Sequence, residues 1–177
     1  VLMVGRYAGE KRQDELIDAC AKSRHAREIQ VILAGKGPLE KKYRRLAEKL
    51  PNPIVMSFYE PARLLQILHM ADLYVHTSHA EIEAMSCMEA FACGLVPVIA
   101  DSPRSATPQF ALDERSLFPA GDTDALAQRI DWWIEHPAER QEMERRYADH
   151  AGQYSLENSI LQTEEMFRQA IAEQKKV

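Results

Sequence analysis

Short apolar runs alternate with longer segments of helical period along the first hundred residues of this chain. Runs of this length and composition are typical of strands buried on both faces of a parallel sheet. In the segments between them, apolar residues recur three or four positions apart, as in helices that cover a sheet. The alternation therefore predicts a doubly wound α/β domain. The predicted strands are 1–5, 29–35, 53–58, 71–77 and 95–100, and the predicted crossover helices are 10–24, 38–50, 60–70 and 83–93.

The remainder of the chain has a different pattern. The segment 101–122 is predicted to form loop and a short strand, because the alternation weakens there. Helix-start signals follow, in the form of capping side chains and a proline suited to a first turn. The predicted helices are 124–136 behind Asp122 or Thr123, 137 to about 152 beginning at Pro137, and 156–174 behind Ser155, before a polar KKV end.

Composition narrows the classes of partner. With 177 residues, 46% of them hydrophobic, the chain can bury one core, which predicts a single globular domain. A net charge of −5 gives no general attraction to nucleic acid, so no nucleic-acid partner is expected. The basic stretch 41–49 forms either a solvated helix face or a peripheral contact with an anionic membrane surface.

Three features bear on location and completeness. No apolar run is long enough to span a membrane, and the three cysteines lack metal-binding spacing, which predicts reduced thiols in a cytoplasmic protein. We therefore expect no disulfide and no zinc site. The opening VLMVG enters a buried strand without a starting Met or a polar lead-in, which indicates a fragment of a longer protein.

Two predicted strands end in glycine-containing loops with basic residues. The first loop contains Gly5, Arg6 and Lys11, where glycine permits close backbone approach and two cations can converge on a diphosphate. A solvated loop with incidental charges explains these residues equally well. The second loop, 35–37, is explained by turn chemistry, with a direct ligand role for Lys36 as the alternative.

A third strand leads to two carboxylates, Glu81 and Glu89, with seven residues between them. The helix here is expected to begin near 81–83, so that the amides of 82–86 point outward and favour an anion. Eight residues of helix span about 12 Å, which prevents the carboxylates from sharing a proton or a metal ion. They are expected instead to bind hydroxyl groups at two ends of one extended ligand, a ribose and a hexose, with phosphates between them.

Spacing alone leaves a structural alternative open. Glu81 and Glu83 can simply favour a helix N-terminus while Glu89 is a surface residue. Glu89 lies in an apolar helix-to-strand passage, where an unpartnered carboxylate is costly to bury, and this favours a ligand role. His76 and His79 lie near the same predicted cleft, with either a functional or a hydrogen-bonded structural role.

In their order and spacing, these motifs resemble the C-terminal, donor-binding domain of retaining GT-B glycosyltransferases over essentially the whole chain. The resemblance implies a Rossmann-like sheet forming one half of a GT-B fold, a nucleoside diphosphate sugar as donor, and no obligatory metal ion or other cofactor. It divides the chain into a donor-binding domain, 1–154, and a helix, 155–177, that packs back toward an N-terminal acceptor domain outside this sequence. The matching stretches are VGRYAGEK, LAGKGPLEKKYRRLAEKL, ADLYVHTS, the Glu81 to Glu89 pair leading into EAFACGLVPVIA, and FPAGDTDALAQRI.

The resemblance also assigns roles to residues. Arg6 and Lys11 correspond to the cations on the donor diphosphate, Glu81 to the acidic residue near the donor sugar, and Glu89 to the residue that holds the ribose. It makes Glu81, Arg6 and Lys11 the candidate catalytic residues. The further predicted donor contacts are Gly5, the segment Ser57, Phe58 and Tyr59 near the base, and the amides around Ala84, Met85 and Ser86.

One departure from the family pattern follows the first glutamate. Many members have glycines where this chain has Ile82 and Ala84, which is expected to narrow the space beside the sugar. The stretch EIEAMSCMEA is similar to bacterial glucosyltransferases acting on lipids such as cholesterol or diacylglycerol, and to capsular polysaccharide enzymes. That group implies hexose transfer, with UDP-glucose the favoured donor, to a lipid or glycan acceptor at the inner face of the cell membrane. The alternatives are a non-catalytic nucleotide-binding or interaction module of an envelope polysaccharide assembly and, less favoured, a nucleotide-sugar epimerase.

Overall fold

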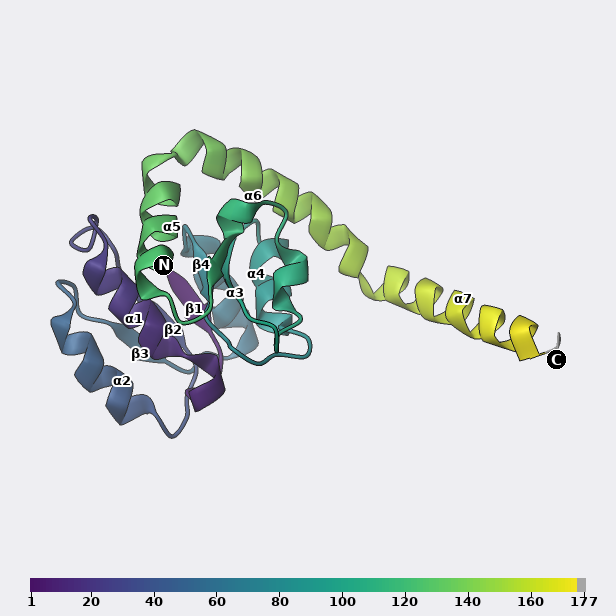
Figure 1. Ribbon diagram of the computed structural model, residues 1–177, viewed down its shortest axis with the longest axis horizontal. Coiled ribbons are helices and arrows are strands. Elements are labelled where there is room, and N and C mark those ends of the chain that lie inside the picture. The colour runs from purple at the N-terminus through teal and green to yellow at the C-terminus, as the bar shows by residue number, and fades with distance from the viewer. Residues whose placement is uncertain (175–177) are drawn as a thin grey trace.

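Six parallel strands form one sheet in the computed structural model, which describes residues 1–174 (Figure 1). The strand order is β3-β2-β1-β4-β5-β6, and it reverses between β1 and β4. In such sheets a crevice opens beyond the carboxyl ends of the two strands at the reversal. The predicted doubly wound α/β fold is confirmed. The strands are β1 Leu2–Val4, β2 Ile32–Ala34, β3 Val55–Ser57, β4 Tyr74–His76, β5 Pro97–Asp101 and β6 Leu117–Pro119.

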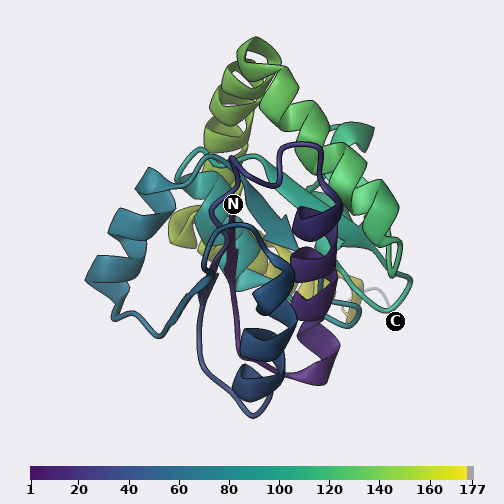
Figure 2. The same cartoon turned by 90° about the vertical axis from the view of Figure 1, so that its left-hand side faces the viewer.

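Helices cover both faces of the sheet. α1 packs against α2 and α5, and α4 packs against α6. Figure 2 shows α3 on the opposite side of the sheet from α1 and α2. The helices are α1 Gln13–Lys22, α2 Glu40–Leu46, α3 Pro61–Met70, α4 Met85–Ala92, α5 Thr123–Glu135, α6 Pro137–Ala151 and α7 Leu156–Gln174.

The predicted helix 10–24 is interrupted at its beginning. A 3-10 turn, Gly9–Lys11, is followed by Arg12 in the left-handed region, with φ 54° and ψ 39°, and α1 begins at Gln13. This conformation is unfavourable for a residue with a side chain, by about 1 kcal/mol or more. The Arg12 carbonyl accepts a hydrogen bond from the Thr77 hydroxyl at 2.9 Å, and its guanidinium bonds Glu15 at 2.8 Å. Contacts from the β4 loop thus stabilise a break that helical periodicity cannot reveal.

Large side chains fill the space between the sheet and its helices. Trp133 is fully buried, whereas Trp132 is only partly buried and stacks on His136 with 4.2 Å between ring centroids. Burial of each large apolar side chain stabilises the fold by roughly 1.5–3 kcal/mol. Cys20 and Cys87 are buried free thiols, whereas Cys93 is only partly buried. The other large fully buried side chains include Tyr7, Tyr43, Tyr74, Tyr147, Phe91 and Phe118.

The basic stretch 41–49 is largely neutralised by neighbouring carboxylates. Lys42 pairs with Asp14 at 3.0 Å, and Arg44 pairs with Glu40 at 2.8 Å. Lys49 also pairs with an aspartate of α1. This pairing favours a solvated helix face, and contact with a membrane stays a prediction.

The last helix extends away from the rest of the chain (Figure 1). It begins behind Ser155, whose hydroxyl accepts a hydrogen bond from the Asn158 amide at 3.2 Å, so the predicted helix and its cap are both confirmed. Every residue of 156–174 is exposed, and 175–177 lie outside the described residues. Within residues 1–174, no helix combines the length and apolar character needed to cross a membrane.

Candidate functional site

The loops after β1 and β2 are joined at the edge of the crevice. The Gly5 amide donates to the Ala34 carbonyl at 3.0 Å, and the Tyr7 amide donates to the Lys36 carbonyl at 3.1 Å. A Cβ atom on Gly35 would lie 2.0 Å from the Gly5 oxygen, and one on Gly37 would lie 2.6 Å from the Tyr7 oxygen. These glycines therefore serve the close contact of two backbones.

A pocket of about 450 Å³ opens in front of β1, β2 and β3. Phe58 and Tyr59 contribute to its wall, and the Lys36 ammonium lies 4.3 Å from the centre of the Phe58 ring. Ser57 does not line this pocket, and its exposed hydroxyl donates to the Phe58 carbonyl at 3.3 Å. Contact of Ser57 with the base stays a prediction. The pocket is lined by Val4, Gly5, Arg6, Ala34, Gly35, Lys36, Gly37, Pro38, Phe58, Tyr59 and Leu64.

Lys11 and Glu81 form an ion pair and hydrogen bond at the reversal between β1 and β4. The Lys11 side chain also lies beside Gly5, at the border of the pocket. Arg6 lines the pocket with its side chain exposed, while its carbonyl accepts from the Gln13 amide group at 2.8 Å. The two predicted cations thus flank the same loop, one free toward the pocket and one paired with a carboxylate.

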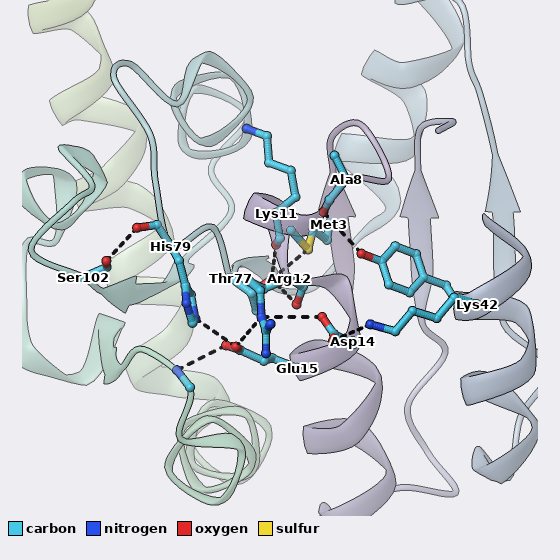
Figure 3. Close-up of polar contacts among 12 residues, drawn as sticks. Met3, Ala8, Lys11, Arg12, Asp14, Glu15, Lys42, Thr77, His79 and Ser102 are labelled. Carbon is cyan, nitrogen blue, oxygen red and sulfur yellow. Dashed lines mark hydrogen bonds and ion pairs between the residues drawn. The ribbon is translucent and has the colours of Figure 1, made fainter. Parts of the chain in front are cut away.

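The β4 loop is held in place by long-range contacts to α1 (Figure 3). The Thr77 hydroxyl lies 2.8 Å from the Lys11 carbonyl and shares its one proton between this oxygen and the Arg12 carbonyl. His79 Nε2 lies 2.8 Å from Glu15 Oε1, and the Ser102 hydroxyl donates to the His79 carbonyl at 2.7 Å. The His79 side chain therefore has a structural contact, whereas the Lys11 side chain in Figure 3 points away from this network.

The predicted start of the helix after β4 is wrong. α4 begins at Met85, and Glu81 lies in the preceding loop, where its amide donates to the Arg104 carbonyl at 3.3 Å and its carbonyl accepts from the Ala106 amide at 3.0 Å. These bonds to the segment after β5 keep Glu81 out of the helix. Ala84 offers no side-chain cap, and first-turn amides lack intrahelical acceptors, so Met85 and Ser86 provide the outward amides instead of 82–86.

The predicted burial of Glu89 is also wrong. Glu89 lies on the exposed side of α4, whereas its neighbours Ala90 and Phe91 are fully buried. It therefore carries no desolvation cost that a ligand must relieve. A role for Glu89 in holding a ribose stays a prediction, supported by resemblance and not by burial.

Ile82 and Ala84 occupy the positions where the family pattern has glycines. Ile82 is 89% exposed, so its side chain projects into solvent and does not narrow the space inside the loop. Ala84 is buried with φ −28° and ψ 63°, and Arg12 is the one non-glycine residue with positive φ in the part of the chain that the structure describes. Neither residue therefore occupies the left-handed region that favours glycine.

The ionisation of Glu81 follows from its neighbours. His76, whose Nε2 lies 3.5 Å from Glu81 Oε2, and Lys11 lower the pKa of Glu81 to about 2, against the opposing effect of partial burial. At neutral pH the carboxylate is therefore charged and can accept hydrogen bonds but cannot donate a proton. Residues 1–174 contain no group of three or more His, Cys, Asp and Glu residues arranged to hold a metal ion. Independence of a metal stays a prediction.

The sequence did not identify Leu64 as a residue of the pocket wall or Tyr74 as the partner of His76, and it left open whether Lys36 contacts a ligand. Leu64 belongs to an amphipathic helix, where no local signal separates a pocket wall from the core. Tyr74 lies two residues before His76, and the two-residue period of a strand places both on one face. A polar aromatic residue and a histidine on the same face of a strand is the signal that could have found it.

Comparison with known proteins gives the class to which this fold and site belong. The family model for group 1 glycosyl transferases matches residues 1–150. The chain belongs to this family of glycosyltransferases. The predicted relation to GT-B glycosyltransferases is confirmed.

Individual relatives cover different parts of the chain. The crystal structure of the catalytic domain of cholesterol-α-glucosyltransferase from Helicobacter pylori is 47% identical, with a TM-score of 0.83 over 87% of this chain and 98% of that one. Anabaena Alr3699/HepE in complex with UDP is 23% identical, with a TM-score of 0.73 over 86% of this chain and 44% of that one, and this match shows the fold. The "Putative glycosyltransferase EpsD" of Bacillus subtilis is 30% identical over 130 residues, 72% of this chain and 34% of that protein. The chain thus spans about a third of this curated relative.

Proposed function

We propose that this chain is the donor-binding part of a retaining glycosyltransferase that moves a hexose, glucose, from a UDP-sugar to a lipid or polysaccharide acceptor. The observation that carries the proposal is the Lys11–Glu81 pair, which lies at the strand reversal. A pocket in front of β1 to β3 and the uncapped start of α4 accompany it. This arrangement offers a cation and helix amides to phosphates, a carboxylate to sugar hydroxyls, and a partly aromatic pocket to a base.

The choice of glucose and a lipid rests on similarity. The catalytic domain of a cholesterol-α-glucosyltransferase is 47% identical to this chain, and the match covers 98% of that domain and 87% of this chain. UDP as the nucleotide is supported by complexes of the same fold, including the pneumococcal O-GlcNAc transferase GtfA with UDP and GlcNAc. Activity of the whole parent protein and the identity of its acceptor belong to this proposal.

In this mechanism the protein stabilises the departing diphosphate. The donor phosphates draw Lys11 away from Glu81, and Arg6 and the first-turn amides of α4 complete the set of donors. Glu81, freed from Lys11, accepts hydrogen bonds from the donor sugar and orients it. Because the pKa of Glu81 is about 2, its role is orientation and electrostatics, and it does not supply the proton.

The C-terminal helix supplies the link to the acceptor domain. Apolar side chains form an exposed stripe along this helix. The stripe includes Leu156, Ile160 and Phe167, which are 75%, 57% and 58% exposed to solvent. We assign this stripe to contact with the N-terminal acceptor domain of the parent protein, as the family resemblance implies.

Calorimetry with UDP tests the assignment of the cations. We expect Arg6→Ala and Lys11→Met each to weaken UDP binding by about 10- to 100-fold, since a hydrogen bond to a charged group contributes about 1.5–3 kcal/mol. Binding of uridine, which lacks the phosphates, should change little. The matched control is Lys22→Ala. Lys22 is an exposed lysine at the C-terminal end of α1, away from Lys11, and it pairs with Asp124 of α5.

Two results would count against the proposal. Equal UDP affinity in native protein, Arg6→Ala and Lys11→Met would overturn the roles of the cations. Transfer is tested with the complete parent chain, UDP-glucose and lipid or glycan acceptors. Donor binding without turnover on any acceptor would favour the non-catalytic module.

A further inference from the structure

A line of polar side chains runs from the Lys11–Glu81 pair into the core. Glu81 Oε2 lies 3.5 Å from His76 Nε2, and His76 Nδ1 lies 3.2 Å from the Tyr74 hydroxyl. The Tyr74 hydroxyl in turn donates to the Ser86 hydroxyl at 3.0 Å. The line therefore connects a predicted phosphate-binding lysine with the first turn of α4, through side chains from three different segments.

The two neighbours of the imidazole both act as hydrogen-bond acceptors. Because the Tyr74 hydroxyl gives its one proton to Ser86, its oxygen faces His76 Nδ1 as an acceptor, and the Glu81 carboxylate faces Nε2 as another. A neutral imidazole has one N–H for these two acceptors. At 3.5 Å from Glu81 Oε2, Nε2 makes no hydrogen bond of normal geometry among the described residues.

An unpartnered buried nitrogen is costly to a fold. His76 is 1% exposed, and a buried polar atom without a partner destabilises a protein by about 1–3 kcal/mol. One added proton would give the imidazole a donor for each of its two acceptors and would make the contact with Glu81 a charge-assisted hydrogen bond. While Lys11 is bound to Glu81 Oε2, a protonated His76 would be a second cation at the same carboxylate, and the two positive charges would repel each other.

On the basis of the function proposed above, we propose that His76 is a positioning residue that replaces Lys11 as the partner of Glu81 when the donor diphosphate binds. The diphosphate takes the Lys11 ammonium, the His76 imidazole takes up one proton from solvent so that both of its nitrogens carry one, and Nε2–H donates to Glu81 Oε2. No covalent bond forms or breaks. The exchange keeps Glu81 charged and fixed in place while Lys11 moves.

The surrounding charges agree with this exchange. Burial lowers the pKa of His76, Glu81 raises it, and Lys11 lowers it, so departure of Lys11 favours protonation. The other titratable groups along the line are Tyr74 and the α4 residue Cys87, and burial raises the pKa of both, so they remain neutral. The two charges that shift the pKa of His76, Glu81 and Lys11, are therefore the two that exchange.

The first test needs no ligand. The pKa of His76 is measured by NMR titration of its imidazole in the native chain and in Lys11→Met. We expect the pKa to rise by about 1 or more in the variant, because an opposite charge remains and a like charge is lost. An unchanged pKa would overturn the proposal. His69, exposed on α3, serves as the internal reference.

The second test measures protons during UDP binding, by calorimetry in buffers of different ionisation enthalpy. We expect the native chain to take up more protons than His76→Gln, whose amide can still donate to Glu81 but cannot titrate. The difference in proton uptake between the native chain and His76→Gln reports the imidazole alone, because the UDP phosphates contribute equally to both. His69→Gln is the matched control and should behave as the native chain.

The outcomes separate the two proposals. UDP binding with equal proton uptake in native protein and His76→Gln would overturn the role of His76 and leave the proposed function intact. Absence of UDP binding by the native chain would overturn the proposed function, whatever the NMR titration shows. A purely structural role for His76 would alter stability and leave proton uptake unchanged.

Discussion

At the scale of single residues, the site depends on two positions that have no side chain. Gly35 and Gly37 let the β2 loop lie directly on the backbone of Gly5 and Tyr7. The contact places the Arg6 side chain and the pocket floor at the end of the sheet. Any Cβ atom there must displace backbone and not a flexible side chain, and densely packed interiors yield little to such displacement.

We therefore expect Gly35→Ala and Gly37→Ala each to lower the free energy of unfolding by about 2 to 3 kcal/mol. Gly152→Ala is the control, since a Cβ atom at Gly152 meets nothing within 4 Å and its φ of −57° suits alanine. That substitution should be neutral or stabilise by up to about 1 kcal/mol. Urea denaturation followed by circular dichroism provides the measurement. Equal stability of all three variants would show that the two loops can separate without cost.

At the scale of elements, local signals decided the helices of the second half. Asp122 caps α5, and its carboxylate accepts from the amides of Asp124 and Ala125 at 3.1 and 2.9 Å. We expect Asp122→Ala to lower the free energy of unfolding by about 1 kcal/mol, because two first-turn amides lose their acceptor. Asp122→Asn retains an oxygen at this position and should stay close to the native chain. If asparagine and alanine are equally destabilising, charge and not capping is the cause.

The difference between local signals and distant contacts explains which elements the sequence predicted correctly and which it did not. Helices α5, α6 and α7 begin within about one residue of their predicted positions, because capping and first-turn proline signals lie in the neighbouring sequence. The loop that carries Glu81 is fixed by Arg104 and Ala106, more than twenty residues further along the chain. The break at Arg12 depends on Thr77, 65 residues away. Spacing and family resemblance therefore placed Lys11 and Glu81 in one candidate site, where the structure has them in contact, whereas the backbone that carries Glu81 is set by tertiary contacts.

At the scale of the whole molecule, two parts differ in how they are stabilised. The residues of 1–151 include a continuous buried core, whereas α7 has no buried residue and projects from the body (Figure 1). In proteins, most of the stability of a helix comes from tertiary packing of its amphipathic face. The proposed contact with an acceptor domain would supply that packing to the exposed apolar stripe of α7.

That dependence gives a prediction that compares this chain with its complete parent. We expect the double variant Ile160→Asp and Phe167→Asp to leave UDP binding and the unfolding of the 1–151 body unchanged here, because both side chains are more than half exposed. In the complete parent, the same variant should abolish most transfer and lower stability by several kcal/mol, since each buried side chain contributes about 1.5–3 kcal/mol. The control, Gln162→Asp with Gln169→Asp, adds the same charge to the opposite face of α7 and should leave transfer intact. Equal activity of both double variants in the parent would exclude the stripe as the contact with the acceptor domain.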